Sequence, residues 1–172
     1  MPHTMKRYIF FAVMSSVLLM TGCIDRGTAD YVPSISTSFF VTTTGDTLER
    51  HYNATDNFYY LDSVSVGDTV FFNIGFYTYA NFLVTTDVDW DTTMLAVSTS
   101  LTPDFRAGLS NASDSAAVDA LHYEYTSGYN GASFPLFAAP KQSGSSKMSF
   151  VVESNAQKVQ NTTTASVWFY VR

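Results

Sequence analysis

Hydrophobic residues recur at every second position through most of this chain after residue 34. The strongest example is 69–76, where Val70, Phe72, Ile74 and Phe76 fall on one side of an extended chain. A period of two places alternate side chains on opposite faces of a β-strand. The β-branched and aromatic residues of this segment also favour a strand. The pattern therefore predicts a strand here with one buried face.

The same period predicts other strands along the chain. They fall at 35–41, 58–66, 82–90, 94–101, 121–126, 148–152 and 167–171. Turn residues such as Gly45 and Gly67 lie between them. The polar segment 46–57 fits either a hairpin arm or a loop. Residues 128–146 are rich in Gly, Pro and Ser, so we expect long connections there.

Three of these segments predict specific faces. In the first, the shared face comprises Ile35, Thr37, Phe39 and Val41; in the third it comprises Phe82, Val84, Thr86, Val88 and Trp90. Asp87 and Asp89 then lie on the opposite face, which indicates that this side meets water. Leu121, Tyr123 and Tyr125 alternate with polar residues in the same way, which is typical of a half-buried strand.

The period-two alternation is lost at residues 104–120. Ser113 and Asp114 can cap a helix N-terminus, and Ala117 and Leu121 are one helical turn apart. This pattern fits a short helix over 115–121, and a loop fits equally well.

Seven or eight short, evenly spaced strands with little helix predict an all-β fold. Such spacing is typical of an antiparallel sandwich or barrel. Because several strands show one wet face, we favour an immunoglobulin-like antiparallel β-sandwich over residues 35–172. The cysteine pair of antibody domains is absent, so the expectation concerns the architecture alone.

The N-terminal segment has a different pattern. Lys6 and Arg7 precede an uncharged apolar run at 8–20. As a helix, this run is about 20 Å long at ~1.5 Å per residue, which is short for a hydrocarbon core of ~30 Å. A secretory signal over residues 1–22 fits both its length and its flanks.

Small residues, Thr21 and Gly22, stand just before Cys23, the only cysteine of the chain. This arrangement resembles the lipobox of bacterial lipoproteins, although Met20 stands where leucine is usual. The resemblance implies cleavage before Cys23, a diacylglycerol on its sulfur and a fatty acyl group such as palmitate on its new amino group. Residues 24–34 would then form a tether. The alternative is an ordinary signal peptide beside a chance cysteine.

Charge and composition narrow the function further. Without residues 1–22, the chain has 7 Lys+Arg against 15 Asp+Glu, a net charge near −8. An acidic chain without a basic cluster repels phosphate backbones, so we expect no nucleic-acid partner. A single cysteine excludes an internal disulfide, and the 14 Phe and 11 Tyr supply apolar area for packing instead.

Three carboxylates stand at alternate positions, at Asp87, Asp89 and Asp91. Such spacing can begin a calcium loop. However, Thr92 and Ser98 stand where an EF-hand needs Gly and Glu. A looser calcium site and three solvated acids remain the alternatives, and the second requires no metal.

Catalytic patterns are absent from the sequence. There is no GxSxG elbow and no phosphate-binding glycine loop, and His51 and His122 lie outside any metal-ligand spacing. We therefore predict no catalytic residue and no cofactor. A hydrolase is disfavoured for want of any such constellation.

Aromatic residues offer a binding chemistry. Tyr77, Tyr79 and Tyr129 lie within two residues of Gly or Asn, in or beside expected loops. With Trp90, they are candidates for flat faces on which sugar rings stack. The alternative is that aromatic residues serve the core, which we favour for Tyr123 and Tyr125.

A triplet of Asp, a hydroxyl residue and a small or apolar residue recurs along the chain. It resembles the O-glycosylation acceptor motif of some exported proteins of gut-type anaerobic bacteria. The modified residues would be Thr47, Ser63, Thr69, Thr92 and Ser115. Asp-Thr pairs are also ordinary starts of strands after turns.

Together, these patterns predict a non-enzymatic cell-envelope protein, held at the outer membrane by a lipid anchor and either periplasmic or surface-exposed. Its β-sandwich would bind or scaffold a glycan or another envelope protein. The alternative is a carbohydrate-binding module of a surface glycan-capture system.

Overall fold

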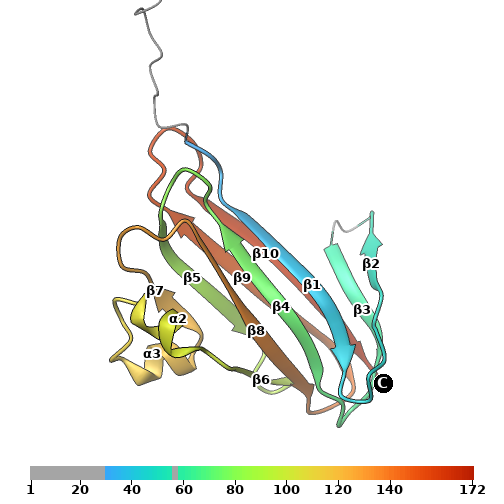
Figure 1. The fold of residues 1–172 in the computed structure, drawn as a ribbon. Coiled ribbons are helices and arrows are strands. Elements are labelled where there is room, and N and C mark those ends of the chain that lie inside the picture. Colours follow the sequence, from blue (N-terminus) through green and yellow to red (C-terminus); the bar gives the residue numbers. More distant parts are fainter. Residues whose placement is uncertain (1–29, 56–57) are drawn as a thin grey trace, which may run out of the picture.

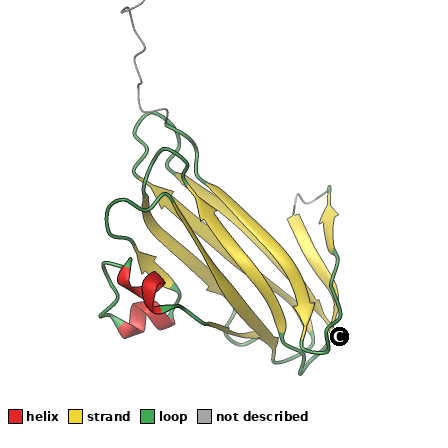
Figure 2. Cartoon of the chain, in the orientation of Figure 1, coloured by secondary structure: helices red, strands yellow, loops and turns green. Residues whose placement is uncertain are grey.

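The computed structural model describes residues 30–55 and 58–172. The expected signal peptide, Cys23 and the tether up to residue 29 lie outside these residues. Ten strands and two short helices follow one another along the described chain (Figures 1 and 2). They are β1 (Ser34–Thr42), β2 (Arg50–Asn53), β3 (Phe58–Val64), β4 (Val70–Tyr77), β5 (Leu83–Trp90), β6 (Leu95–Thr99), α2 (Pro103–Ala107), α3 (Ser115–Asp119), β7 (His122–Glu124), β8 (Gly131–Pro140), β9 (Gly144–Ser154) and β10 (Thr162–Val171).

The strands form two sheets packed face to face. One sheet has the order β1-β4-β8-β6, and the other has the order β2-β3-β10-β9-β5-β7. Every pairing is antiparallel except that of β3 with β10. The predicted all-β sandwich is confirmed, with ten described strands instead of seven or eight.

The core lies between the sheets, and β4 contributes its centre. Val70, Phe72, Ile74 and Phe76 have no exposed surface, as their alternation predicts. Facing them from the other sheet are the buried residues Met148, Phe150, Val152, Val167 and Phe169. Each fully buried side chain of this kind contributes about 1.5–3 kcal/mol relative to an exposed one.

A β-bulge changes the predicted face of β1. Between Ser38 and Val41 the strand advances three residues while its partner β4 advances two. One extra residue in a strand reverses the alternation beyond it. As a result Phe40 enters the core and Val41 is only half-buried, so the prediction that Val41 shares the inner face is wrong.

A second bulge changes the beginning of β5. The register against β9 shifts between Leu83 and Thr85. Leu83 is buried, whereas Phe82 and Val84 are exposed, which corrects the predicted face. Beyond the bulge, Thr86 and Val88 point inward as expected.

The long connections predicted at 128–146 are wrong. This segment contains β8, an inner strand of its sheet, and the start of β9. Its inward positions, Phe134, Leu136 and Ala138, alternate with period two. The abundance of Gly, Pro and Ser concealed this pattern, because these residues usually indicate turns.

The helices connect β6, an edge strand of one sheet, to β7, an edge strand of the other, and so lie along one side of the sandwich (Figure 1). Asp114 caps α3 by accepting a hydrogen bond from the Ala117 amide, so the helical alternative is confirmed. Helix α2 was not predicted. Thr102 caps it and Pro103 opens it, a sequence that favours a helix start as much as a strand end.

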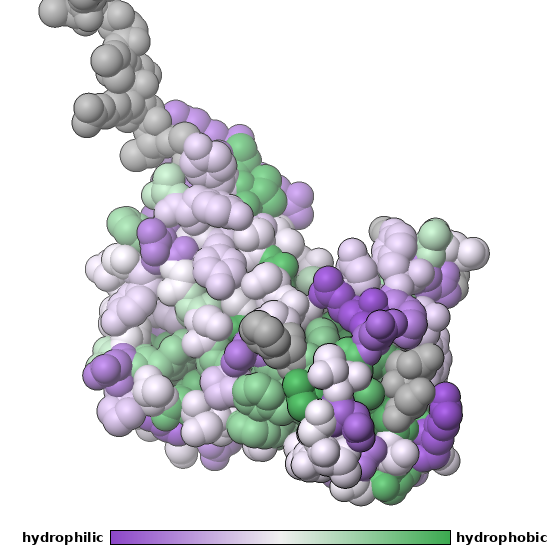
Figure 3. All heavy atoms as spheres, turned by 45° about the vertical axis from the view of Figure 1, so that its right-hand side comes forward, coloured by the Kyte–Doolittle hydropathy of each residue, from purple (hydrophilic) through white to green (hydrophobic). Residues whose placement is uncertain are grey.

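The segment 46–57 contributes a hairpin arm, β2, which pairs with β3. Through the β3–β10 pairing the hairpin extends the six-stranded sheet, and its far end projects beside a hollow (Figure 3). Within residues 30–55 and 58–172, no helix is long and apolar enough to cross a membrane.

Candidate functional site

Tyr77 ends β4 on the outer face of the four-stranded sheet, with 41% of its surface exposed. Its ring covers two glycines. A Cβ atom on Gly75 would lie 2.7 Å from the Tyr77 hydroxyl and 2.8 Å from Cε2, and one on Gly131 would lie 3.2 Å from Cδ1. Atoms from both edges of the ring thus contact the backbone below. The ring therefore packs over both glycines, and the rest of its surface is exposed.

Tyr129 rests on a glycine in the same way. A Cβ atom on Gly108, at the end of α2, would lie 2.6 Å from the Tyr129 hydroxyl oxygen and from Cζ. Tyr129 is 40% exposed. Both tyrosines therefore owe their positions to residues that lack a side chain.

The loops that carry these tyrosines are hydrogen-bonded to each other. The Thr78 amide donates to the Asn130 carbonyl at 2.9 Å, and the Leu83 amide donates to the Tyr129 carbonyl at 2.7 Å. The Asn130 side-chain amide donates to the Tyr79 carbonyl at 3.2 Å. Tyr79 is the most exposed of the three tyrosines, and its ring centroid lies 5.8 Å from that of Tyr31.

Two adjoining hollows share the first residues of β8. We call them together the tyrosine groove. One is lined by Tyr77, Tyr79, Asn130, Gly131, Ala132 and Ser133; the other is lined by Thr102, Asp104, Phe105, Tyr125, Tyr129 and the same residues 131–133. The structure thus brings together Tyr77, Tyr79 and Tyr129, three of the four predicted glycan-binding residues.

Trp90, the fourth, is not part of the groove. It ends β5, whereas Leu83, at the start of β5, is bonded to Tyr129. Seven residues of strand separate the two ends by about 23 Å at ~3.3 Å per residue. Trp90 is half-buried and packs against the core.

The three carboxylates predicted as weak metal candidates have separate roles. Asp87 lies 2.5 Å from His122 Nδ1, across the β5–β7 pairing. Asp91 accepts from the amide and the hydroxyl of Thr93, and these bonds lower the pKa of Asp91. Asp89 is exposed on the outer face of β5. In the described part of the chain, no three His, Cys, Asp or Glu residues are grouped to hold a metal.

His122 lies between two acids. Its Nε2 atom is 3.5 Å from Glu124 Oε1, on the other side of the ring from Asp87. The hydrogen bond to Asp87 is the largest cause that raises the pKa of His122, and the charges of Asp87 and Glu124 add to it. This group responds to pH, and it lies on the solvent side of the six-stranded sheet, as the alternation predicts.

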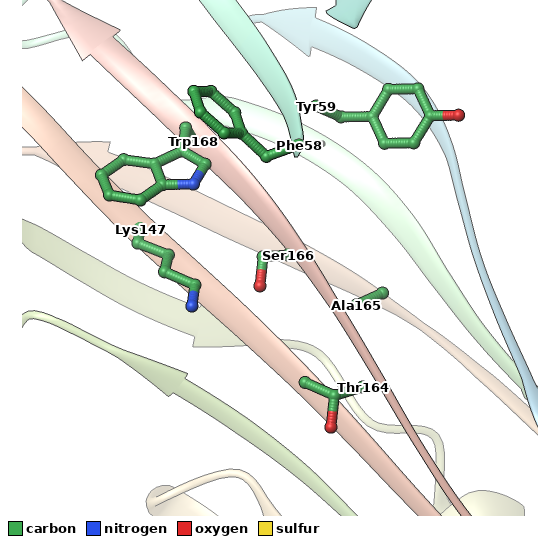
Figure 4. A pocket seen from close by; sticks show the side chains of 7 residues that line it. All are labelled: Phe58, Tyr59, Lys147, Thr164, Ala165, Ser166 and Trp168. Atoms are coloured by element: carbon green, nitrogen blue, oxygen red, sulfur yellow. The ribbon is translucent and has the colours of Figure 1, made fainter. Parts of the chain in front are cut away.

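A separate hollow, outside the tyrosine groove, could not be predicted from the sequence. It lies between the β2–β3 hairpin and the body, has a volume of about 480 Å³ and is lined by Phe58, Tyr59, Lys147, Thr164, Ala165, Ser166 and Trp168. Phe58 and Trp168 lie side by side, while Tyr59 points the other way (Figure 4). We call it the hairpin notch. The period-two pattern of residues 167–171 predicts that Trp168 points outward. It does not show which residue of β3 lies beside Trp168.

The notch exists because β3 covers only part of β10. The β3–β10 pairing begins at Val167 and Tyr59. Within the described residues, Thr162–Ser166 pair with β9 alone. This half of β10 is therefore an open sheet edge, which can accept another strand.

Four of the five candidate O-glycosylation residues have described side chains, and all four reach the surface. Thr47, Thr92 and Ser115 are exposed, and Thr69 is half-buried. Ser63 belongs to β3, and its side chain lies outside the description. Their modification stays a prediction.

The comparisons with known proteins give little. No protein-family model matches the chain, and no curated protein sequence matches it. Among solved structures, it is similar to a family 123 glycoside hydrolase from Clostridium perfringens, studied for glycolipid glycan hydrolysis. The match has a TM-score of 0.40 and 17% identity, and it covers 83% of this chain and 27% of that one. The chain thus spans about a quarter of that enzyme, and the likeness carries no argument about function.

Proposed function

We propose that this chain is a non-enzymatic, lipid-anchored protein of the bacterial cell envelope that binds a glycan in its tyrosine groove. The anchor would be Cys23, whose sulfur and amino group carry the lipid at the outer membrane. Two or three acyl chains hold a protein at a bilayer on cellular timescales. The sandwich then needs no membrane-spanning element of its own.

The observation that supports glycan binding is the seating of Tyr77. A half-exposed ring that packs over Gly75 and Gly131 offers an apolar surface to a ligand, and the backbone beneath supports it. Rigid, exposed aromatic rings give contact area at low entropic cost. The hydroxyls and amides beside the ring, on Ser133 and Asn130, suit the hydroxyls of a sugar.

The test is a glycan array followed by calorimetry with the full-length protein in detergent. We expect Tyr77→Ala to weaken binding at least tenfold, about 1.4 kcal/mol. The matched control is Tyr170→Ala, because Tyr170 is similarly exposed but lies on β10 of the other sheet. Silence on the array, or equal losses in both variants, would contradict the proposal.

A subtler variant keeps the tyrosine and removes its support. In Gly75→Ala, the new Cβ would stand 2.7 Å from the Tyr77 hydroxyl, so the ring must leave its position. We expect the affinity to fall nearly as far as in Tyr77→Ala. The new Cβ would also stand 2.9 Å from Ser36 Oγ on β1, so this side-chain end must move too. We expect the fold to be kept, because both close contacts are with side-chain ends and alanine is better than glycine in a strand interior by roughly 0.5–1 kcal/mol.

The lipid anchor has its own test. Cells supplied with a clickable fatty acid should label the natural protein, whereas the Cys23→Ser variant should take up no label. Equal labelling of the two, or labelling of neither, would refute the lipid anchor and would leave the proposal of glycan binding unaffected.

A second candidate function is the scaffolding of another envelope protein, favoured by the open edge of β10. An extended peptide could add to the sheet along Thr162–Ser166, with an apolar side chain against Phe58 and Trp168. A photo-crosslinker at Thr164 should then give a discrete protein adduct in native cells. A crosslinker at exposed Ser145 on β9 is the control, and the same adducts from both sites would refute this function.

A further inference from the structure

The charges around the tyrosine groove are one-sided. Eleven residues line its two hollows, and Asp104 is the only charged one among them. No lysine or arginine belongs to the lining, although both residue types occur elsewhere on the described surface. A carboxylate or sulfate in the groove would therefore meet one acidic side chain, Asp104, and no cationic side chain in the lining.

The polar groups of the groove are neutral hydroxyls and amides. Ser133 Oγ donates to the Ile74 carbonyl at 3.0 Å, which leaves the oxygen free to accept a second bond. Thr102 Oγ1 accepts from the Phe105 amide, so its own hydrogen can be donated. Asp104 is exposed in the first turn of α2 and can accept from sugar hydroxyls. This set matches polyhydroxylated, uncharged rings.

The two exposed tyrosines line different hollows of the groove. Tyr77 covers Gly131 from the β4 side of β8, whereas Tyr129 lies in the hollow on the α2 side. A ligand that stacks on both tyrosines must therefore extend across both hollows. A ligand that uses both faces has at least two rings.

We infer that the tyrosine groove binds neutral oligosaccharides of two or more rings and excludes acidic ones, such as uronates. This inference deepens the proposed glycan-binding function and rests on it. The groove lining has no lysine or arginine that could pair with an acidic sugar. An uncharged sugar gains the stacking and the hydrogen bonds without electrostatic repulsion. An acidic sugar meets Asp104 and the net negative charge of the protein as well.

The experiment compares glycans that differ only in charge. Full-length protein in detergent is titrated with a neutral oligosaccharide found by the array, and with the same oligosaccharide oxidised to carboxylates at its primary hydroxyls. We expect at least tenfold weaker binding of the oxidised form. Asp104→Asn should reduce this difference in affinity between the two glycans. Higher salt should reduce the same difference in the natural protein, because salt screens the repulsion.

The outcomes separate the two proposals. Equal or tighter binding of the oxidised glycan, or an array positive for acidic glycans alone, overturns neutral selectivity and leaves glycan binding intact. An array without any bound glycan overturns the proposed function itself. Equal affinity for a monosaccharide and its dimer overturns the two-ring requirement.

Discussion

At the scale of single residues, two tyrosines near β7 differ in one hydrogen bond. The Tyr125 hydroxyl is 2.9 Å from Thr86 Oγ1. The Tyr123 hydroxyl is buried and has no partner among the described residues, and burial raises its pKa to about 12. A buried hydroxyl without a partner costs free energy that a bonded one does not.

This difference predicts opposite effects of the same substitution. Tyr123→Phe should leave the free energy of unfolding unchanged or raise it by up to about 1 kcal/mol, whereas Tyr125→Phe should lower it by about 1 kcal/mol. Urea denaturation of both variants measures the two values. A larger loss in Tyr123→Phe would show that its hydroxyl has a partner, such as a water molecule.

His122 gives a prediction about pH. Because its pKa is raised by Asp87, the protonated form is the one that the fold favours. Its contribution to stability is therefore fully present below pH 6.5, the ordinary pKa of histidine, and is lost as the pH rises through the raised pKa of His122. The pair is partly exposed, so the contribution should stay below about 1 kcal/mol.

An NMR titration of the His122 ring tests this prediction. Asp87→Asn should lower the pKa of His122 more than Glu124→Gln does, because the Asp87 hydrogen bond is the largest cause of the shift. Asp87→Asn should also reduce the loss of stability as the pH rises above 6.5, the ordinary pKa of histidine. Equal shifts in both variants would mean that charge, and not the short hydrogen bond, controls this histidine.

At the scale of elements, β8 is the strand that holds its sheet together. It lies between β4 and β6, and Leu136 at its centre has no exposed surface. We expect Leu136→Ala to lower the free energy of unfolding by about 2–5 kcal/mol. Ser98→Ala on the neighbouring β6, at an exposed position, should change it by no more than about 0.5 kcal/mol. Similar values in urea denaturation would show that β8 is not a core strand.

At the scale of the whole molecule, the tether limits how the domain can sit. Asp30 lies seven positions after Cys23, so at most about 25 Å of fully extended chain joins the two residues. Asp30 is held at one end of the sandwich, where its carboxylate accepts from the amides of Gln157 and Lys158. Ala80 lines the same hollow as Asp30. Ser143 precedes β9 and so lies at the other end of that strand, about 33 Å from the Asp30 end.

We therefore expect the Asp30 end to stay nearer the bilayer than the opposite end. Acylation would block the sulfur of Cys23, so Ala80→Cys and Ser143→Cys each give one labelling site. In proteoliposomes with an acceptor dye on the lipid, energy transfer should be stronger from residue 80 than from residue 143. Equal transfer would show that the domain takes no preferred orientation, and weak transfer from both would refute the anchor.

The alternation of the sequence determined the fold class and most strands. A period of two needs no knowledge of neighbours, because it follows from the geometry of an extended chain. This is why the inner face of β4, from Val70 to Phe76, was predicted in full. The cap of α3 at Asp114 was also readable, since capping depends on residues a few positions apart.

Tertiary structure decided the features that depend on contacts between distant residues. The bulges in β1 and β5 reverse a face that alternation alone extends, and β8 gains its place from partners on both sides. The groove depends on Gly75, Gly108 and Gly131, which look like turn or spacer residues in sequence but support Tyr77 and Tyr129. Composition could nominate the tyrosines; only packing could show which of them lie together and separate Trp90 from them.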